Sequence, residues 1–321
     1  MKLPLAVTMG DPAGIGPEVA LKALADPAVR VCGPFLLVGS RRVFGETARR
    51  LSLPSEPPAE VLDCAPVDFA GRFGALHPDL AEAAARAAEE AARLALAGKV
   101  AGMVTAPLTK EGLHLAGRPY PGHTEMLAVL CNSLGQELML LVGGGLRVAL
   151  VTTHLAIAEV PAAITAERVG RRLSALAAGL ARDFGLVAPR IGVLALNPHA
   201  GEGGRFGSEE LTQIAPAMEA ARALGIAATG PLPADSAFHK ALAGGFDAIL
   251  AMYHDQGLAV LKALAFDTGV NATLGLPIVR TSPDHGTAYD IAGQGTASPN
   301  SMIAAIKLAR EISDRRAKTT A

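Results

Sequence analysis

Several residue types that commonly define a protein's class are scarce in this chain of 321 residues. Tryptophan is absent, aromatic residues make up 4% of the chain, and the only cysteines are Cys32, Cys64 and Cys131. Three widely spaced cysteines without a C-x-x-C pair argue against a disulfide framework and against a cysteine-rich zinc site. This cysteine usage instead favours a reducing, cytoplasmic compartment.

The chain also lacks a surplus of positive charge and a long apolar run. It has 29 Lys and Arg against 30 Asp and Glu, a net charge of −1. This balance argues against a nucleic-acid or anionic-membrane partner. The uncharged stretch 291–306 contains Gly, Gln, Pro and Asn, so it does not predict a transmembrane helix of about 20 apolar residues.

The usual nucleotide-binding fingerprints are missing as well. Four G-x-G triplets begin at Gly14, Gly143, Gly201 and Gly293, and none continues to G-x-G-x-x-G or its alanine variant. The chain has no G-x-x-x-x-G-K-S/T motif either. A standard Rossmann site and a Walker-type NTPase are therefore not expected.

The pattern that the chain does have is an alternation of short apolar runs with longer helical segments. Half of its residues are hydrophobic and 18% are charged, as in a globular protein. Apolar runs without polar alternation are typical of strands that are covered on both faces. The alternation predicts a three-layer α/β/α architecture with a largely parallel sheet. Residues 138–142 and 148–153, around Gly143–Gly145, are predicted to form a hairpin.

Three histidines follow predicted strands directly. His154 follows residues 148–153, His199 follows 191–196 after Asn-Pro, and His254 follows 248–253. Parallel strands end at one edge of a sheet, where three neutral imidazoles could bind one divalent ion. The alternative is that they are three separate polar loop residues. The spacing along the chain does not decide between these interpretations.

Other polar residues are candidates for binding an anionic substrate or for proton transfer. Lys262, Asn271 and Arg280 could hold an anion, or each could be a solvated surface residue. Asp255 could orient the His254 imidazole or act as a base. Asp235 could be a base or a helix N-cap. The loop Gly10–Gly16 follows the first strand, and its two prolines remove donors, so a supporting role is expected.

These residues lie within motifs that resemble those of the 4-hydroxythreonine-4-phosphate dehydrogenase (PdxA) family of vitamin B6 biosynthesis. The resemblance runs from end to end of the chain and rests on GDPAGIGPE (10–18), TAPLTK (105–110), PGHTE (121–125), VTTHLA (151–156), NPHAGEGGRFG (197–207), GPLPADS (230–236), MYHDQGLAVLK (252–262), GVNATLGLP (269–277) and RTSPDHGTAYDIAGQG (280–295).

The resemblance implies a fold and an assembly. The fold would be like that of isocitrate and isopropylmalate dehydrogenases, with two interleaved subdomains around a cleft. Their approximate extents would be residues 1–118 with 285–321, and residues 119–284. The active site would lie at the subunit interface of a homodimer.

The resemblance also implies a reaction. The enzyme would use NAD or NADP to oxidise 4-phosphooxy-L-threonine to 2-amino-3-oxo-4-phosphooxybutanoate. That acid would then lose CO2 to give 3-amino-2-oxopropyl phosphate. Two alternatives stay open: oxidation of another phosphorylated hydroxy acid, such as a four-carbon sugar-acid phosphate, and phosphate acyl transfer.

Finally, the resemblance implies residue roles. One divalent cation per subunit (Zn²⁺, Mg²⁺ or Co²⁺) would be held by His154 and His199 of one chain and His254 of the other. The expected substrate contacts are His123, Thr124, Lys262, Asn271 and Arg280. The expected cofactor contacts, in a loop of the wider dehydrogenase superfamily, are His285, Gly286, Thr287, Ala288 and Asp290. The base candidates are Asp235, Asp255 and Lys262.

Overall fold

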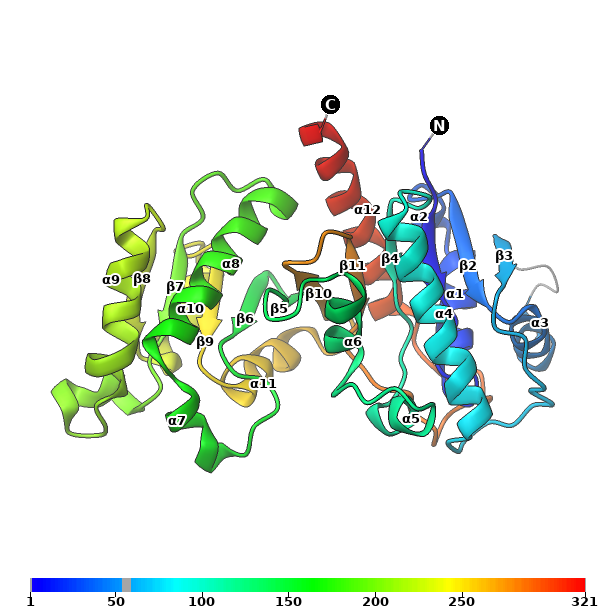
Figure 1. The fold of residues 1–321 in the computed structure, drawn as a ribbon, viewed down its shortest axis with the longest axis horizontal. Helices are drawn as coiled ribbons and strands as arrows, with labels where there is room; N and C mark the ends of the chain where they lie inside the picture. Colours follow the sequence, from blue (N-terminus) through cyan, green and yellow to red (C-terminus); the bar gives the residue numbers. More distant parts are fainter. Residues whose placement is uncertain (1, 54–58, 321) are drawn as a thin grey trace. The chain divides into compact units, whose positions relative to one another are not determined.

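The chain folds into two compact units. The structure, a computed structural model, describes residues 2–53 and 59–320. Unit 1 is formed by Met1–Glu137 with Val270–Ala321, and unit 2 by Leu138–Gly269 (Figure 1). The expected divisions after residues 118 and 284 therefore move to 137 and 269. The C-terminal shift has a simple cause: β10 (Val270–Leu274) pairs with β11 (Arg280–Pro283), and β11 pairs with β4 (Gly102–Val104) of unit 1.

Unit 1 is built around strands in the order β3-β2-β1-β4-β11-β10. Its further elements are β1 (Leu5–Thr8), α1 (Gly16–Ala25), α2 (Pro27–Arg30), β2 (Phe35–Gly39), α3 (Arg41–Arg50), β3 (Glu60–Asp63), α4 (Pro78–Leu96), α5 (Lys110–Leu115), α6 (His123–Leu130) and α12 (Asn300–Thr320). All four residues of β1 are buried, so this strand is covered on both faces. In Figure 1, α4 lies in front of the strands of unit 1 and α12 behind them.

Unit 2 has the strand order β5-β6-β9-β7-β8. Its elements are β5 (Leu138–Gly143), β6 (Leu146–Leu150), η1 (Ile157–Glu159), α7 (Val160–Ala163), α8 (Ala166–Phe184), β7 (Ile191–Leu194), η2 (Pro198–Gly204), η3 (Glu210–Ile214), α9 (Ala215–Ala223), β8 (Ala228–Leu232), α10 (Ala234–Leu242), β9 (Ala248–Ala251) and α11 (His254–Ala265). β5 and β6 form the expected hairpin, because Gly144 and Gly145 adopt the positive φ angles of its turn.

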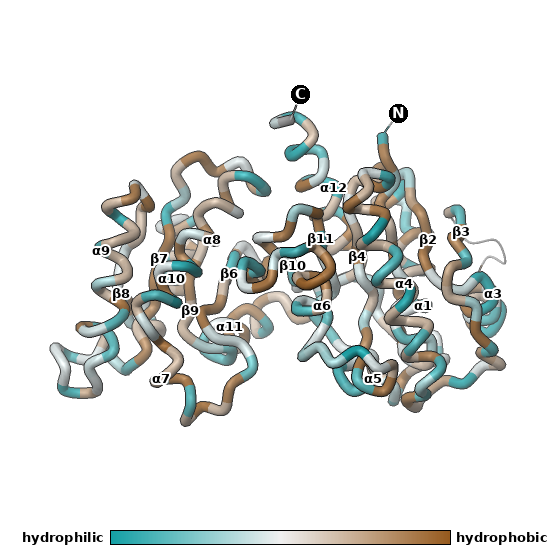
Figure 2. The backbone as a smooth tube through the Cα atoms, viewed as in Figure 1, coloured by the Kyte–Doolittle hydropathy of each residue, from teal (hydrophilic) through white to brown (hydrophobic). Residues whose placement is uncertain are grey.

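The strands of unit 2 are buried on both faces. Val148 of β6 is in register with Ile249 of β9, and both join the core that α10 and α11 cover. Ala149 and Leu250, the next registered pair, point to the opposite face and are also buried. α8 and α9, which pack on β5 and β8, cover that face. Figure 2 shows the result as brown, hydrophobic strands such as β9 beside helices that alternate between teal and brown.

The strands lie close to the positions that the apolar runs predict, with differences at their ends. The apolar runs at 35–39 and 270–274 predict strands, and β2 and β10 have these bounds, whereas β6, β7 and β9 end two or three residues before the predicted 153, 196 and 253. The sheet is mixed, because β10 and β11 are antiparallel, as are β5 and β6. The proline-rich sequence of residues 52–66 predicts an irregular segment; 54–58 lie outside the described residues, and 60–63 form β3.

None of the described helices combines the length and the apolar character needed to cross a bilayer.

We predict that the core of unit 2 depends strongly on α11. Leu261 is fully buried in this core, whereas Leu264 on the same helix is 49% exposed. Leu261→Ala should lower the free energy of unfolding by about 2–5 kcal/mol, since it leaves a cavity. Leu264→Ala, the matched control, should change it by no more than about 0.5 kcal/mol. Urea titration of both variants measures this, and equal midpoints would contradict the packing described.

Candidate functional site

The three histidines expected at strand ends follow three neighbouring parallel strands of unit 2. β9 pairs in parallel with β6 on one side and with β7 on the other. His154 lies in the loop after β6, His199 lies in η2 after β7, and His254 is the first residue of α11 after β9. The ring centroids of His154 and His254 are 5.9 Å apart within one chain. The expectation that strand pairing brings such residues to one edge is thus confirmed for this pair.

Asp255 contacts the His254 imidazole. Its Oδ1 lies 2.7 Å from His254 Nδ1, and its side chain is otherwise 84% exposed. When Nδ1 carries the proton, Nε2 is left as the free lone pair. A histidine whose second nitrogen is held by a carboxylate is a common arrangement around metal ions, so this residue fits a metal ligand. This contact is compatible with the orienting role of Asp255, and both of its expected roles stay predictions.

The backbone of His199 has neither strand nor helix geometry. Its φ of 52° and ψ of 31° lie in the left-handed region, and the residues that follow it are left-handed as well. Within residues 2–53 and 59–320, no group of three His, Cys, Asp or Glu side chains is placed to hold an ion together. The chain therefore brings two of the three predicted ligands near each other, namely His154 and His254. This pair differs from the one that the resemblance implied for a single chain, His154 with His199.

The other candidates of unit 2 lie on helices. Asp235 is exposed in the first turn of α10, where Pro233 occupies the N-cap position. The N-cap interpretation of Asp235 was therefore wrong. Lys262 is half-buried on α11, two turns after His254.

Arg280 forms a buried cationic site in unit 1. It begins β11 and is 4% exposed. Its Nε and Nη2 donate to Thr105 Oγ1 at 3.1 and 2.8 Å, and its Nη1 donates to Thr273 Oγ1 at 3.0 Å. Burial lowers the pKa of Arg280 to about 10, against the opposing influence of the Glu125 charge.

The partners of Arg280 are neutral hydroxyl groups. No carboxylate of the described residues forms an ion pair with the guanidinium. A buried charge without a counter-charge is costly, and a guanidinium matches the geometry of carboxylate and phosphate groups. Arg280 is thus suited to bind an anion and is not the solvated surface residue of the alternative interpretation.

His123 lies beside this charge. It is the first residue of α6, and its buried Nε2 has no hydrogen-bond partner among the described residues. Burial, reinforced by the Arg280 charge, lowers the pKa of His123 to about 3. Thr124 follows it, and Asn271 is half-buried on β10. Four of the five expected substrate contacts therefore lie in unit 1, and Lys262 lies in unit 2.

The expected cofactor loop, His285–Asp290, follows β11 and is hydrogen-bonded to the loop Gly10–Gly16. Tyr289 Oη donates to Asp11 Oδ2 at 2.5 Å, and Ile15 N donates to Thr287 O at 2.9 Å. A Cβ on Gly14 would lie 2.7 Å from Thr287 O, so only glycine permits this approach. The first glycine loop thus has the expected supporting role.

Sequence reasoning missed both members of the Asp11–Tyr289 pair. Burial raises the pKa of the Asp11 carboxyl, although the Tyr289 hydroxyl acts in the opposite direction. Burial, together with the bond to Asp11, raises the pKa of Tyr289. Both residues were inside the quoted motifs, but nothing in the spacing indicates that residues 278 positions apart are in contact.

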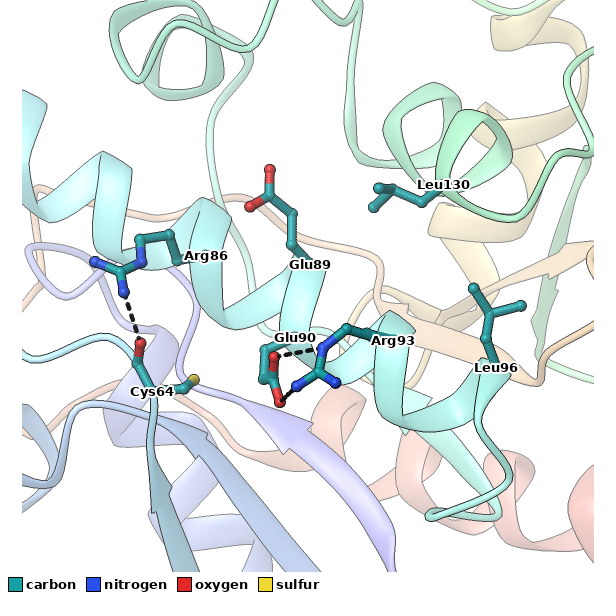
Figure 3. Close-up of a pocket in the computed structure, with 7 residues that line it drawn as sticks. All are labelled: Cys64, Arg86, Glu89, Glu90, Arg93, Leu96 and Leu130. Carbon is teal, nitrogen blue, oxygen red and sulfur yellow. Dashed lines mark hydrogen bonds and ion pairs between the residues drawn. The ribbon is translucent and has the colours of Figure 1, made fainter.

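A cavity of ≈ 400 Å³ in unit 1 lies elsewhere (Figure 3). It is lined by Cys64, Arg86, Glu89, Glu90, Arg93, Leu96 and Leu130. Arg86 donates to the Cys64 carbonyl at 3.2 Å, and Arg93 pairs with Glu90. No predicted site residue lines this cavity, and its cationic side chains already have partners, so we do not assign the reaction to it.

Solved structures resemble this arrangement of strands and helices. The crystal structure of 4-hydroxythreonine-4-phosphate dehydrogenase from Klebsiella pneumoniae has a TM-score of 0.87, with 41% identity over 97% of this chain and all of that one. A terephthalate 1,2-cis-dihydrodiol dehydrogenase from Burkholderia xenovorans has a TM-score of 0.66 at 29% identity over 97% of this chain and 98% of that one. Isocitrate dehydrogenase from Methylococcus capsulatus, with 14% identity over 100% of this chain and 89% of that one, has a TM-score of 0.50 and shows the fold alone.

The chain is thus an α/β protein with an isocitrate dehydrogenase-like fold and a buried arginine whose hydrogen-bond partners are threonine hydroxyls. Residues 30–309 match the model of the family described as pyridoxal phosphate biosynthetic protein PdxA. The 4-hydroxythreonine-4-phosphate dehydrogenase of Trichlorobacter lovleyi is 47% identical over 97% of this chain and 98% of its own length. This chain belongs to the PdxA family.

We predict that His123 stays neutral between pH 8 and 5. Its pKa of about 3 lies below the ordinary value near 6.5, so over that interval the unfolded chain binds the proton that the folded protein does not. Stability should therefore fall as the pH drops below about 6.5, and less so in His123→Asn. In NMR titrations, the His123 ring signals, assigned by their loss in His123→Asn, should not move between pH 8 and 5. A midpoint within that range would contradict the burial described.

Proposed function

We infer that the chain is a 4-hydroxythreonine-4-phosphate dehydrogenase of pyridoxal phosphate biosynthesis. Identities of 47% and 49% to the enzymes of Trichlorobacter lovleyi and Geobacter metallireducens, over at least 95% of both chains, support this activity. The reaction oxidises the C3 hydroxyl of 4-phosphooxy-L-threonine and transfers a hydride to NAD or NADP. The product, 2-amino-3-oxo-4-phosphooxybutanoate, loses CO2 to give 3-amino-2-oxopropyl phosphate.

The buried Arg280 is the observation that carries the substrate assignment. Its guanidinium is held by two threonine hydroxyls and has no carboxylate partner among the described residues. A phosphate or carboxylate group of the substrate supplies the missing negative charge. We assign His123, Thr124, Asn271 and Lys262 to the same substrate. The neutral His123 adds no second positive charge at neutral pH and offers Nε2 as a hydrogen-bonding atom.

We propose that His154, His199 and His254 hold one divalent cation (Zn²⁺, Mg²⁺ or Co²⁺). The carboxylate on His254 Nδ1 fits this role. When bound, such an ion would make the substrate hydroxyl more acidic. The proton acceptor is one of Asp235, Asp255 and Lys262. For Asp255 to act, its carboxylate would have to exchange its contact with His254 for one with the substrate.

We assign the dinucleotide to the loop that contains His285, Gly286, Thr287, Ala288 and Asp290. The Asp11–Tyr289 hydrogen bond supports this assignment, because it fixes the loop before a cofactor arrives. His285 Nε2 is buried and has no hydrogen-bond partner among the described residues, so it is available to a ligand. We also propose a cytoplasmic location, where a reducing environment would keep Cys32, Cys64 and Cys131 as the free thiols they are.

We predict that Arg280 is needed for the charged end of the substrate. Arg280→Ala should raise KM by roughly 10- to 150-fold, since a lost hydrogen bond to a charged group costs about 1.5–3 kcal/mol. Arg42→Ala, which removes a guanidinium 54% exposed in the same unit, is the matched control. NADH and NADPH formation should be followed with 4-phosphooxy-L-threonine, its dephosphorylated form and four-carbon sugar-acid phosphates. Equal rates with and without the phosphate would contradict the assignment.

We further propose a homodimer in which two chains complete each metal site. His154→Ala, His199→Ala and His254→Ala should each lose the bound ion and most activity. If His254 of the partner subunit completes the site, mixed His154→Ala and His254→Ala chains should recover roughly a quarter of wild-type activity, because half of the dimers contain one intact site.

The three pairwise mixtures distinguish the possible groupings. Mixed His154→Ala and His199→Ala chains should stay inactive if these two ligands come from one chain. Recovery in that mixture, without recovery in the His154→Ala and His254→Ala mixture, would show that His199 and not His254 is the ligand from the partner side. Confirmed heterodimers without recovery in any mixture would place all three ligands on one chain.

A further inference from the structure

The segment that carries His199 has an unusual backbone. Six consecutive residues have positive φ angles: His199 (52°), Ala200 (54°), Gly201 (76°), Glu202 (41°), Gly203 (68°) and Gly204 (98°). We call residues 199–204 the left-handed turn. Left-handed backbone is disfavoured for residues with a Cβ, and three of these six are not glycine. Such a conformation persists only where the surroundings enforce it.

Glu210 binds the two residues Leu196 and Asn197, which lie just before this turn. It is 3% exposed and belongs to η3, which follows the turn. Its Oε1 accepts hydrogen bonds from the backbone N–H groups of Leu196 (2.8 Å) and Asn197 (2.7 Å), and its Oε2 accepts one from Asn197 Nδ2 (3.0 Å). One side chain thus joins the residues after β7 to the helical segment beyond the turn.

The Glu210 carboxylate lies close to the backbone of the turn. A Cβ on Gly201 would lie 2.7 Å from Glu210 Oε2, so the glycine in the middle of the turn leaves room for the carboxylate. Burial acts to raise the pKa of Glu210, but the Asn197 side chain and the backbone N–H groups together hold it below its ordinary value. The group that bridges the two segments is therefore a carboxylate at neutral pH.

We propose that Glu210 is a positioning residue that holds His199 in the left-handed turn and so presents its imidazole to the divalent ion. This proposal rests on the proposed metal-binding role of His199. The sequence did not reveal it, because Ser208 followed by Glu210 has the pattern of a helix N-cap. In the structure the Glu210 carboxylate instead accepts the N–H groups that follow β7.

The test compares cobalt binding by the wild type and three variants. Glu210→Ala removes the bridge, and Glu210→Gln keeps its shape but turns an amide N–H₂ toward Asn197 Nδ2. Glu219→Ala, an exposed carboxylate on α9, is the matched control. The Co²⁺ dissociation constant and its d–d absorption should be measured for the whole protein. Glu210→Ala should weaken binding by about 10- to 100-fold and Glu210→Gln by less, with Glu219→Ala unchanged.

A double-mutant comparison separates positioning from general destabilisation. If Glu210 acts through His199, Glu210→Ala should add no further loss of Co²⁺ affinity in a His199→Ala background. Unchanged affinity in Glu210→Ala and Glu210→Gln, or an additive loss in the double variant, would overturn the positioning role while leaving the metal site in place. If His199→Ala itself binds Co²⁺ as tightly as wild type, the proposed metal-binding role of His199 fails, and this proposal fails with it.

Discussion

The parallel pairing of β6, β9 and β7 is the constraint on which the chemistry of unit 2 depends. Parallel strands all end at one edge, so the residues that follow them converge without any local sequence motif. His154 and His254, 100 positions apart, have ring centroids 5.9 Å apart for this reason. The burial of both sheet faces fixes the strand register, because a slip by one residue would exchange the two faces of each strand.

Unit 1 contributes a different kind of site, the buried charge of Arg280, with which no carboxylate of the described residues forms an ion pair. Thr105 and Thr273 fix the Arg280 guanidinium through its N–H groups without neutralising it. The neighbouring His123 is held neutral by burial and by the same charge. Keeping such a charge in the interior costs free energy, which the packing around it must offset. If an anion binds there as proposed, the N–H donors are already oriented for it.

Apolar runs and turn glycines were enough to predict the sheet in outline and the positions of the three histidines. β11 was missed because Arg-Thr-Ser-Pro reads as a polar loop, although all four residues are buried. The expected cofactor loop follows this strand, and its anchor, the Asp11–Tyr289 bond, depends on tertiary contact alone. The left-handed turn could not be predicted from the sequence either, because His, Ala and Glu disfavour its backbone conformation.

The order of the two units along the chain has a consequence for synthesis on the ribosome. Unit 2 is contiguous, whereas unit 1 needs residues from both sides of it. β4 ends at Val104 and β11 begins at Arg280, so β4 gains β11 as a neighbour only after about 175 further residues have been made. At about 5–20 residues per second, that delay is roughly 9–35 s. During this time one edge of β4 is unpaired, which makes the nascent N-terminal segment the part most exposed to wrong strand pairing and to chaperone binding.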